Sequence, residues 1–150
     1  MAEPGSPSGE TVPEFSFDHG AVSVPDLERS IAWYERVLGF SVLRKFWLEA
    51  ASARCAMMGR GSLMIELFEP EDAVPLSPER REPNLDVQLL GNKHVAFKCD
   101  DLDAMIAWFE HQGADIALRV EASFGRAVFV RDNAGNLIEF VARAASTEAS

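Results

Sequence analysis

The sequence predicts an α+β fold of two tandem modules, each with the element order strand, helix, strand, strand, strand. The first observation behind this prediction is an internal repeat, because the segment 19–35 returns as 94–110, 75 positions further along the chain. The second is that each copy holds a helical stripe of apolar residues and is followed by three segments with strand or turn signals. The third is a stretch rich in proline and charge, 71–92, between the copies. We therefore place module one at 14–70 and module two at 93–142.

Local signals justify each element of module one. A strand over 17–24 leads to Asp26, whose side chain can cap a helix, and Gly39 is typical of the position where a helix ends. The apolar residues between them recur at the spacing of one buried helix face: Leu27, Ile31, Tyr34 and Leu38. Three strands are expected to follow, over 41–48, 51–58 and 62–68.

Module two repeats these signals in the same order. Asp101 can cap a helix that contains Ile106 and Phe109 and ends at Gly113. The expected strands cover 94–99, 114–119, 125–131 and 136–141. The turn residues of 132–136 predict a hairpin between the last two strands.

The remaining segments are expected to be tails and a connection. Segment 1–13 is rich in Pro, Gly and Ser and predicts a disordered tail, and 143–150 predicts a frayed end. Segment 71–92 has no regular periodicity, so it is either a linker between the modules or a loop that covers the mouth of a site. These two interpretations stay open at the level of sequence.

Composition restricts the class of partner. The formal net charge of −10 disfavours binding to the phosphate backbone of nucleic acids. No apolar run approaches the length of a membrane span, and the N-terminus lacks the pattern of a secretory signal, so we expect a cytoplasmic protein without a membrane partner. The two cysteines, Cys55 and Cys99, are expected to be reduced and to pack as small apolar residues.

Four residues at repeated places predict a metal site. His19 and His94 begin the two copies of the repeat, and Glu66 and Glu139 each lie inside an otherwise apolar strand. Burying an unpaired carboxylate costs several kcal/mol, although a strand glutamate can also face solvent. Because both pairs recur while positions such as Gly20 have diverged, we interpret the four side chains as ligands of one divalent first-row metal ion. Four such ligands leave two positions open in octahedral geometry, where substrate oxygens can bind.

The sequence also resembles the vicinal oxygen chelate superfamily, which includes glyoxalase I, methylmalonyl-CoA epimerase, extradiol dioxygenases and the fosfomycin and bleomycin resistance proteins. The resemblance runs from about residue 15 to 142 and is carried by the stretches 18–27, 33–40, 65–70, 94–102 and 132–139. It implies two βαβββ modules that form a cupped, partly closed mixed sheet around the metal. By position, His19, Glu66, His94 and Glu139 match the family's metal ligands.

The resemblance implies a metal-dependent isomerase or lyase of the glyoxalase and epimerase type. One ion, Ni, Co, Zn, Mn or Fe, would bind two neighbouring oxygens of a small-molecule substrate and favour an enediolate-type intermediate. Glu139 or Glu66 would carry the proton, with the choice between them open. The alternatives are an Fe(II)-dependent dioxygenase on the same scaffold and a non-enzymatic small-molecule binding or resistance protein. Bacterial glyoxalase I carries an arginine four residues after its first histidine that helps hold glutathione, and this chain has Ser23 there.

Three further residues are candidates for substrate contacts. Arg126 could pair with an anionic substrate or lie on the surface, and Trp47 could line the pocket or pack elsewhere. Phe129, on the same predicted strand as Arg126, is the third candidate. We expect a homodimer, in which the metal site forms either within one chain or between subunits.

Overall fold

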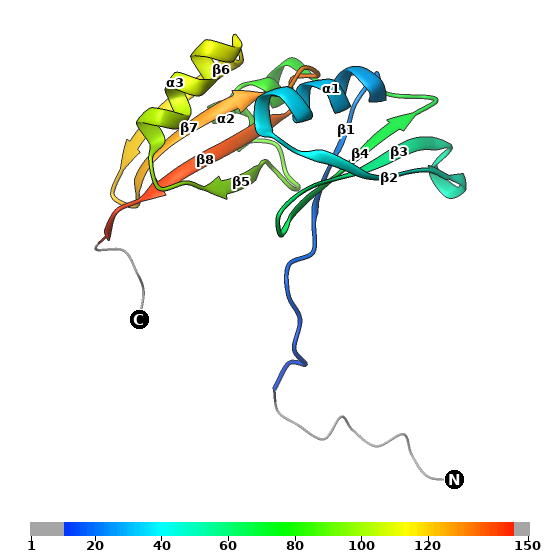
Figure 1. Cartoon of the computed structure of the whole chain (residues 1–150), viewed down its shortest axis with the longest axis horizontal. Helices are drawn as coiled ribbons and strands as arrows, with labels where there is room; N and C mark the ends of the chain where they lie inside the picture. Colours follow the sequence, from blue (N-terminus) through cyan, green and yellow to red (C-terminus); the bar gives the residue numbers. More distant parts are fainter. Residues whose placement is uncertain (1–10, 146–150) are drawn as a thin grey trace.

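The computed structural model describes residues 11–145 and contains two four-stranded sheets (Figure 1). The first sheet has the spatial order β1-β4-β3-β2 and consists of β1 (Gly20–Ser23), β2 (Ser41–Leu48), β3 (Ala53–Arg60) and β4 (Leu63–Pro70). The second has the order β5-β8-β7-β6 and consists of β5 (Val95–Lys98), β6 (Asp115–Ala122), β7 (Gly125–Arg131) and β8 (Leu137–Arg143). The predicted α+β fold of two tandem modules is confirmed, and neither sheet closes on itself.

The two sheets have the same internal pairing. β1 runs parallel to β4 and β5 runs parallel to β8, whereas the other neighbours are antiparallel. Each sheet also has a β-bulge at the same place, between Val42 and Arg44 in β2 and between Ile116 and Leu118 in β6. The duplication therefore extends to irregular details of the backbone.

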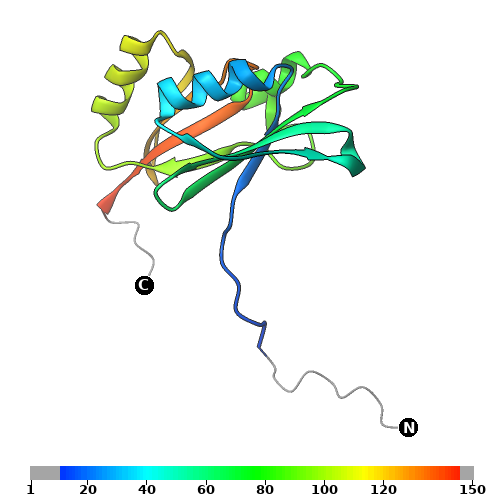
Figure 2. The same ribbon diagram turned by 45° about the vertical axis from the view of Figure 1, so that its right-hand side comes forward.

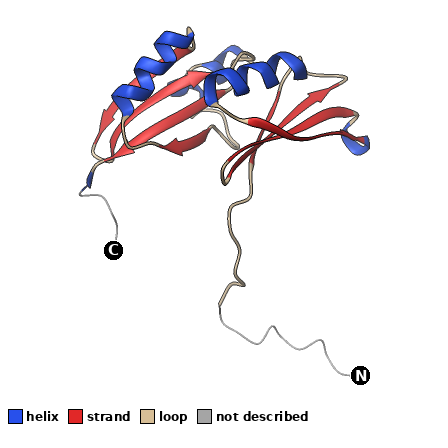
Figure 3. Ribbon diagram, viewed as in Figure 1, coloured by secondary structure: helices blue, strands red, loops and turns tan. Residues whose placement is uncertain are grey.

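Helices α1 (Leu27–Leu38) and α3 (Leu102–Gln112) begin and end at the predicted residues. The side chains of Asp26 and Asp101 accept hydrogen bonds from backbone N–H groups in the first turns. Gly39 and Gly113 end the helices with φ of 70° and 66°, a left-handed conformation that favours glycine. Figure 3 shows both helices on the same side of the molecule.

Short helical turns occupy two stretches for which no helix was predicted. A 3-10 turn, η1 (Glu49–Ala51), delays the start of β3 to Ala53, so the strand expected over 51–58 begins two residues late. The segment between the modules contains η2 (Pro78–Arg81) and the single-turn helix α2 (Pro83–Asp86).

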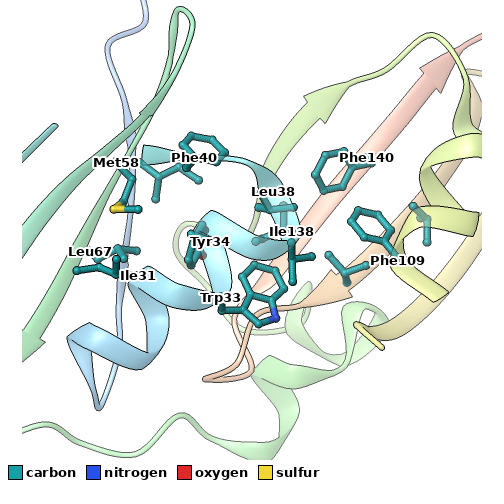
Figure 4. Close-up of a cluster of buried hydrophobic side chains, with 14 of the residues drawn as sticks. Ile31, Trp33, Tyr34, Leu38, Phe40, Met58, Leu67, Phe109, Ile138 and Phe140 are labelled. Atoms are coloured by element: carbon teal, nitrogen blue, oxygen red, sulfur yellow. The ribbon is translucent and has the colours of Figure 1, made fainter. Parts of the chain in front are cut away.

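The hydrophobic core lies between the two sheets, around α1 (Figure 4). Seven residues of α1 are buried, compared with three of α3. A chain of ring contacts joins the modules, from Tyr34 through Phe40 and Phe97 to Phe140. Each such pair contributes about 0.5–1.5 kcal/mol beyond the area that it buries. The modules therefore share one core.

A buried polar contact also joins the modules. The hydroxyl of Tyr34 on α1 donates to Asp132 Oδ2 at 2.9 Å. The other carboxylate oxygen, Oδ1, accepts from the backbone N–H groups of Ala134 and Asn136 in the turn between β7 and β8. Asp132 therefore organises the predicted hairpin turn and holds it against α1.

The segment between the modules packs against the second sheet. Arg131 on β7 donates to the backbone oxygen of Arg81 at 2.7 Å and to Glu82 at 3.0 Å. Within the segment, the buried carboxylate of Asp86 accepts from Arg80. Figure 2 shows the long extended approach of the chain to β1. The predicted tails fall largely on 1–10 and 146–150, which lie outside the described residues.

Among the described residues, no helix is long and apolar enough to cross a membrane.

Candidate metal centre

Strand alternation places both glutamates on faces turned away from the core. Ile65 and Leu67 pack against α1, so Glu66 between them points to the opposite side of the first sheet. Ile138 and Phe140 belong to the same core, so Glu139 likewise points to the opposite side of the second sheet. We call these opposite sides the open faces of the two sheets.

In module one, His19 and Glu66 form a pair on the open face. His19 Nε2 lies 3.0 Å from Glu66 Oε2, and the parallel register of β1 and β4 sets Ala21 beside Glu66. His19 Nδ1 lies 2.6 Å from Asp18 Oδ2. The hydrogen bond to Asp18 is the largest cause that raises the pKa of His19 above its ordinary value, with Glu66 acting in the same direction and burial opposing both.

Module two repeats the pair. His94 Nε2 lies 2.8 Å from Glu139 Oε2, and Ala96 on β5 is in register with Glu139. The His94 ring packs edge-on against Phe129, with 4.8 Å between the ring centroids. All four side chains are only partly exposed, the glutamates at 14% and 15%. Each module therefore places one imidazole nitrogen and one carboxylate oxygen at one point of its open face.

In this structure the four predicted ligands stand as two pairs. Within residues 11–145, no group of three or more His, Cys, Asp or Glu side chains is arranged to hold a metal ion. The helix-covered sides of both sheets pack around α1, and the starts of β1 and β5 lie near each other, since a Cβ added to Gly20 would lie 3.4 Å from the side chain of Val95. Each module alone presents half of the predicted ligand set.

The donor groups fit a divalent first-row metal. Imidazole and carboxylate together suit such an ion, and neither pair includes a thiolate. The contact between His19 Nδ1 and Asp18 fixes the ring, as carboxylates do for histidine ligands, and leaves Nε2 directed to Glu66. Asp18 was not predicted from sequence, although its position directly before His19 was the available signal.

The three predicted substrate contacts lie in different surroundings. Phe129 is in register with Glu139 and lies on the open face. Arg126 lies on the other side of β7, where it pairs with Asp103 of α3 at 2.9 Å. That ion pair raises the pKa of Arg126 and lowers the pKa of Asp103. Trp47 also lies on the helix-covered side, in register with Arg54, and its Nε1 donates to Glu49. The structure brings Phe129 beside the ligand pair and leaves Arg126 and Trp47 away from it.

The two cysteines and the third histidine, His111, differ in exposure. Cys55 and Cys99 are both free thiols, the first fully buried and the second partly buried. Burial is the largest cause that raises the pKa of both thiols. His111, near the end of α3, is exposed.

Comparison with known proteins agrees with the duplicated fold. The family model of the Glyoxalase/Bleomycin resistance protein/Dioxygenase superfamily matches residues 16–140. The uncharacterized protein YwkD of Bacillus subtilis is 31% identical over 101 residues, which cover 67% of this chain and 73% of YwkD.

Two solved structures show the same fold at low identity. Glyoxalase I of Leishmania major, described as trypanothione-dependent, aligns with a TM-score of 0.65 at 24% identity, covering 86% of this chain and 87% of that one. A single-residue mutant of the fosfomycin resistance protein FosX of Listeria monocytogenes, complexed with Mn(II) and 1S,2S-dihydroxypropylphosphonic acid, aligns with a TM-score of 0.62 at 13% identity, covering 87% and 94%. With a family model that spans both modules, this chain belongs to the Glyoxalase/Bleomycin resistance protein/Dioxygenase superfamily.

Proposed function

We propose that this protein is a metal-dependent isomerase or lyase of the glyoxalase and epimerase type. The observation that carries the proposal is the repeated pair, since His19 with Glu66 and His94 with Glu139 converge at equivalent points of two open faces. The Mn(II) in the FosX complex supports a divalent ion at such a centre. The ion would be Ni, Co, Zn, Mn or Fe.

We infer that the complete ligand set forms when the two pairs come closer than they do here, either within one chain or between two copies of it. Within residues 11–145 the two pairs form no group of three or more donors, although a Cβ added to Gly20 beside His19 would lie 3.4 Å from Val95 beside His94. A closer approach of the two modules would join the pairs within one chain. A twofold dimer can instead oppose module one of each subunit to module two of its partner. Such a homodimer has two equivalent sites, each with two imidazoles and two carboxylates.

The chemistry follows from the position of the carboxylates. A divalent ion bound there polarises two neighbouring substrate oxygens and makes the adjacent C–H bond more acidic. In both glutamates Oε2 contacts the histidine, and Oε1 has no partner among residues 11–145. Oε1 of Glu139 or of Glu66 is therefore available to accept the proton and return it. The apolar ring of Phe129 beside His94 helps keep water from this carbon.

The first test is metal content. Elemental analysis of the purified protein should find one divalent ion per chain, and Glu66→Ala and Glu139→Ala should each lower metal affinity strongly. Glu121→Ala removes an exposed carboxylate of the second sheet that lies on the helix-covered side, and it should have no effect. A protein that takes up no divalent ion overturns the proposal.

The second test identifies the type of reaction. The metal-loaded protein should exchange the acidic hydrogen of thiol adducts of 2-oxoaldehydes, or of 2-substituted malonyl thioesters, with deuterium from solvent, as followed by proton NMR. Exchange without consumption of oxygen supports proton transfer. A strict need for reduced iron together with oxygen uptake would instead assign the centre to dioxygenase chemistry.

A further inference from the structure

One cation on the open face of the first sheet has no carboxylate partner in the described part of the chain. The strands of this sheet contain four arginines and lysines: Arg44, Lys45, Arg54 and Arg60. Three of them lie on the helix-covered side, where Lys45 and Arg54 bind Glu28 of α1 and Arg60 donates to the backbone oxygen of Leu38. Arg44 points to the open face, and no carboxylate among residues 11–145 pairs with it.

The register of the sheet aligns Arg44 with the ligand pair. Arg44 on β2 lies opposite Met57 on β3, Met57 lies opposite Glu66 on β4, and Glu66 is beside Ala21 on β1. Adjacent strands are about 4.8 Å apart, so the Cα atoms of Arg44 and Glu66 are separated by roughly 10 Å. A substrate of metabolite size can therefore reach both the ion at Glu66 and the guanidinium of Arg44.

The surroundings of Arg44 hold its charge in place without neutralising it. Its guanidinium carbon lies 4.7 Å from the centre of the Phe46 ring. Phe46 is aligned across the sheet with Cys55 and Phe68, so an apolar row lies next to the charge. A fixed guanidinium beside an apolar surface is suited to bind a carboxylate or phosphonate, since these groups accept two parallel hydrogen bonds.

The described strands of module two offer no free carboxylate besides Glu139 that could neutralise Arg44. On the open face of the second sheet, the row that contains Glu139 continues with Phe129 and Leu118. Apart from Glu139, the strands of the second sheet present one carboxylate on this face, Asp115, and it is paired with Arg131 at 2.9 Å, as is Glu82 of the connecting segment at 3.0 Å. The chain has a net charge of −10, yet none of the carboxylates within residues 11–145 pairs with Arg44 next to the candidate centre. An anionic group of the ligand would supply this missing partner.

We propose that Arg44 binds an anionic group of the substrate, a carboxylate or a phosphonate, while the two neighbouring oxygens of the same substrate bind the ion held at Glu66. The substrates are then small organic acids whose anionic end lies over Phe46. This inference rests on the proposed function, because it assumes a metal-bound substrate at the same site. Arg44 acts as a specificity-determining residue and takes no part in the proton transfer.

Hydroxamates of graded structure test this assignment, because a hydroxamate binds a divalent ion through two adjacent oxygens. The probes are neutral acetohydroxamate, the monohydroxamates of succinic, glutaric and adipic acid, and the equivalents that end in a phosphonate. Binding to the metal-loaded protein is measured by titration calorimetry. At least one acidic probe should bind about 10-fold or more tightly than acetohydroxamate, as expected for a charge-assisted hydrogen bond.

Matched variants locate the origin of that gain. Arg44→Gln should abolish the advantage of the acidic probes while leaving acetohydroxamate unchanged, and Arg44→Lys should retain part of it. Lys45→Gln is the control, since it removes an adjacent positive charge on the other side of the same strand. The carboxylate and phosphonate series show which anion is preferred and at what distance from the ion.

The outcomes separate the two proposals. If acetohydroxamate binds the metal-loaded protein and no acidic probe gains affinity, the role of Arg44 is overturned and the metal centre stands. The same holds if Arg44→Gln and Lys45→Gln reduce the gain equally, because the effect is then general electrostatics. If the protein takes up no divalent ion, both proposals are overturned.

Discussion

The open faces of the two modules share the same candidate ligands and differ in the residues around them. The row across the first sheet is Ala21, Glu66, Met57 and Arg44, and the row across the second sheet is Ala96, Glu139, Phe129 and Leu118. The small residue and the glutamate are the same in both rows, whereas the two outer positions differ in charge and shape. One half thus presents an arginine where the other presents a leucine, and under the proposed function this difference would suit an unsymmetrical substrate.

The two equivalent helices, α1 and α3, also differ in their surroundings. The repeat places Tyr34 of α1 and Phe109 of α3 at equivalent positions, and both are fully buried. The preceding residues differ, because Trp33 is 7% exposed and Trp108 is 42% exposed. α1 lies between the sheets and α3 lies at the outside. The duplicated halves therefore differ in that only α1 is the centre of the common core.

The largest expected effect concerns how the halves combine. A chain with His19→Ala and Glu66→Ala lacks the ligands of module one, and a chain with His94→Ala and Glu139→Ala lacks those of module two. Neither variant alone should bind the ion. If each site combines module one of one subunit with module two of its partner, the mixed dimer has one intact site and should bind one ion per dimer.

Co-expression of the two variants with different purification tags gives the mixed dimer, and elemental analysis gives its metal content. Pairing two module-one variants is the matched control and should restore nothing. If the mixed dimer also stays without metal while wild-type protein binds it, the site does not combine modules from different subunits.

The next effect compares the equivalent tryptophans. Trp33→Ala removes a buried side chain from the core between the sheets and should lower the free energy of unfolding by about 3–5 kcal/mol. Trp108→Ala removes a half-exposed ring and the hydrogen bond from its Nε1 to Val37 O, at a cost of about 1–2 kcal/mol. Urea unfolding measures both values. Equal losses would contradict the assignment of α1 as the central helix.

These asymmetries mark the limit of what the sequence could predict. Helix ends were predictable because Asp26 and Gly39 act locally, and the two histidines and two glutamates that form pairs could be singled out because they recur. Whether Arg126 reaches the site depends on strand register, and its side of β7 follows only from the pairing with β8. The relation between the modules depends on long-range packing around α1, which neither copy of the repeat encodes by itself.

A smaller effect distinguishes Tyr34 from Phe109. Tyr34→Phe removes the hydrogen bond to Asp132 and should cost about 1–3 kcal/mol, because a buried carboxylate oxygen loses one of its two donors and keeps only Asn136 Nδ2 at 3.0 Å. Burial, followed by the charge of Asp132, raises the pKa of Tyr34 well above its ordinary value of 10.0. The folded state therefore holds the phenol proton more tightly, so this contribution is complete below about pH 10 and decreases as the pH rises beyond it.

The measurement uses the fact that Tyr34 is the single tyrosine of the chain. Tyrosinate absorbance should not develop near pH 10 and should appear together with unfolding at higher pH. In the Tyr34→Phe variant, the decrease in stability above pH 10 should be shallower than in the wild type. Titration of Tyr34 near pH 10 in the folded protein would contradict the buried contact.

The smallest expected effect concerns the residues that precede the two histidines. Asp18 holds the Nδ1 atom of His19, whereas Lys93 stands at the equivalent place before His94, and His94 instead packs on Phe129. Because Asp18 is exposed, Asp18→Asn should weaken metal affinity by roughly tenfold, the lower end of the range for such supporting residues. Lys93→Gln should have less effect on metal affinity, since Lys93 donates to the backbone oxygen of Asp86 rather than to the imidazole. Metal competition with a coloured chelator measures both variants. A larger loss in Lys93→Gln than in Asp18→Asn would show that the second histidine, despite its apolar support, is the one whose orientation limits binding.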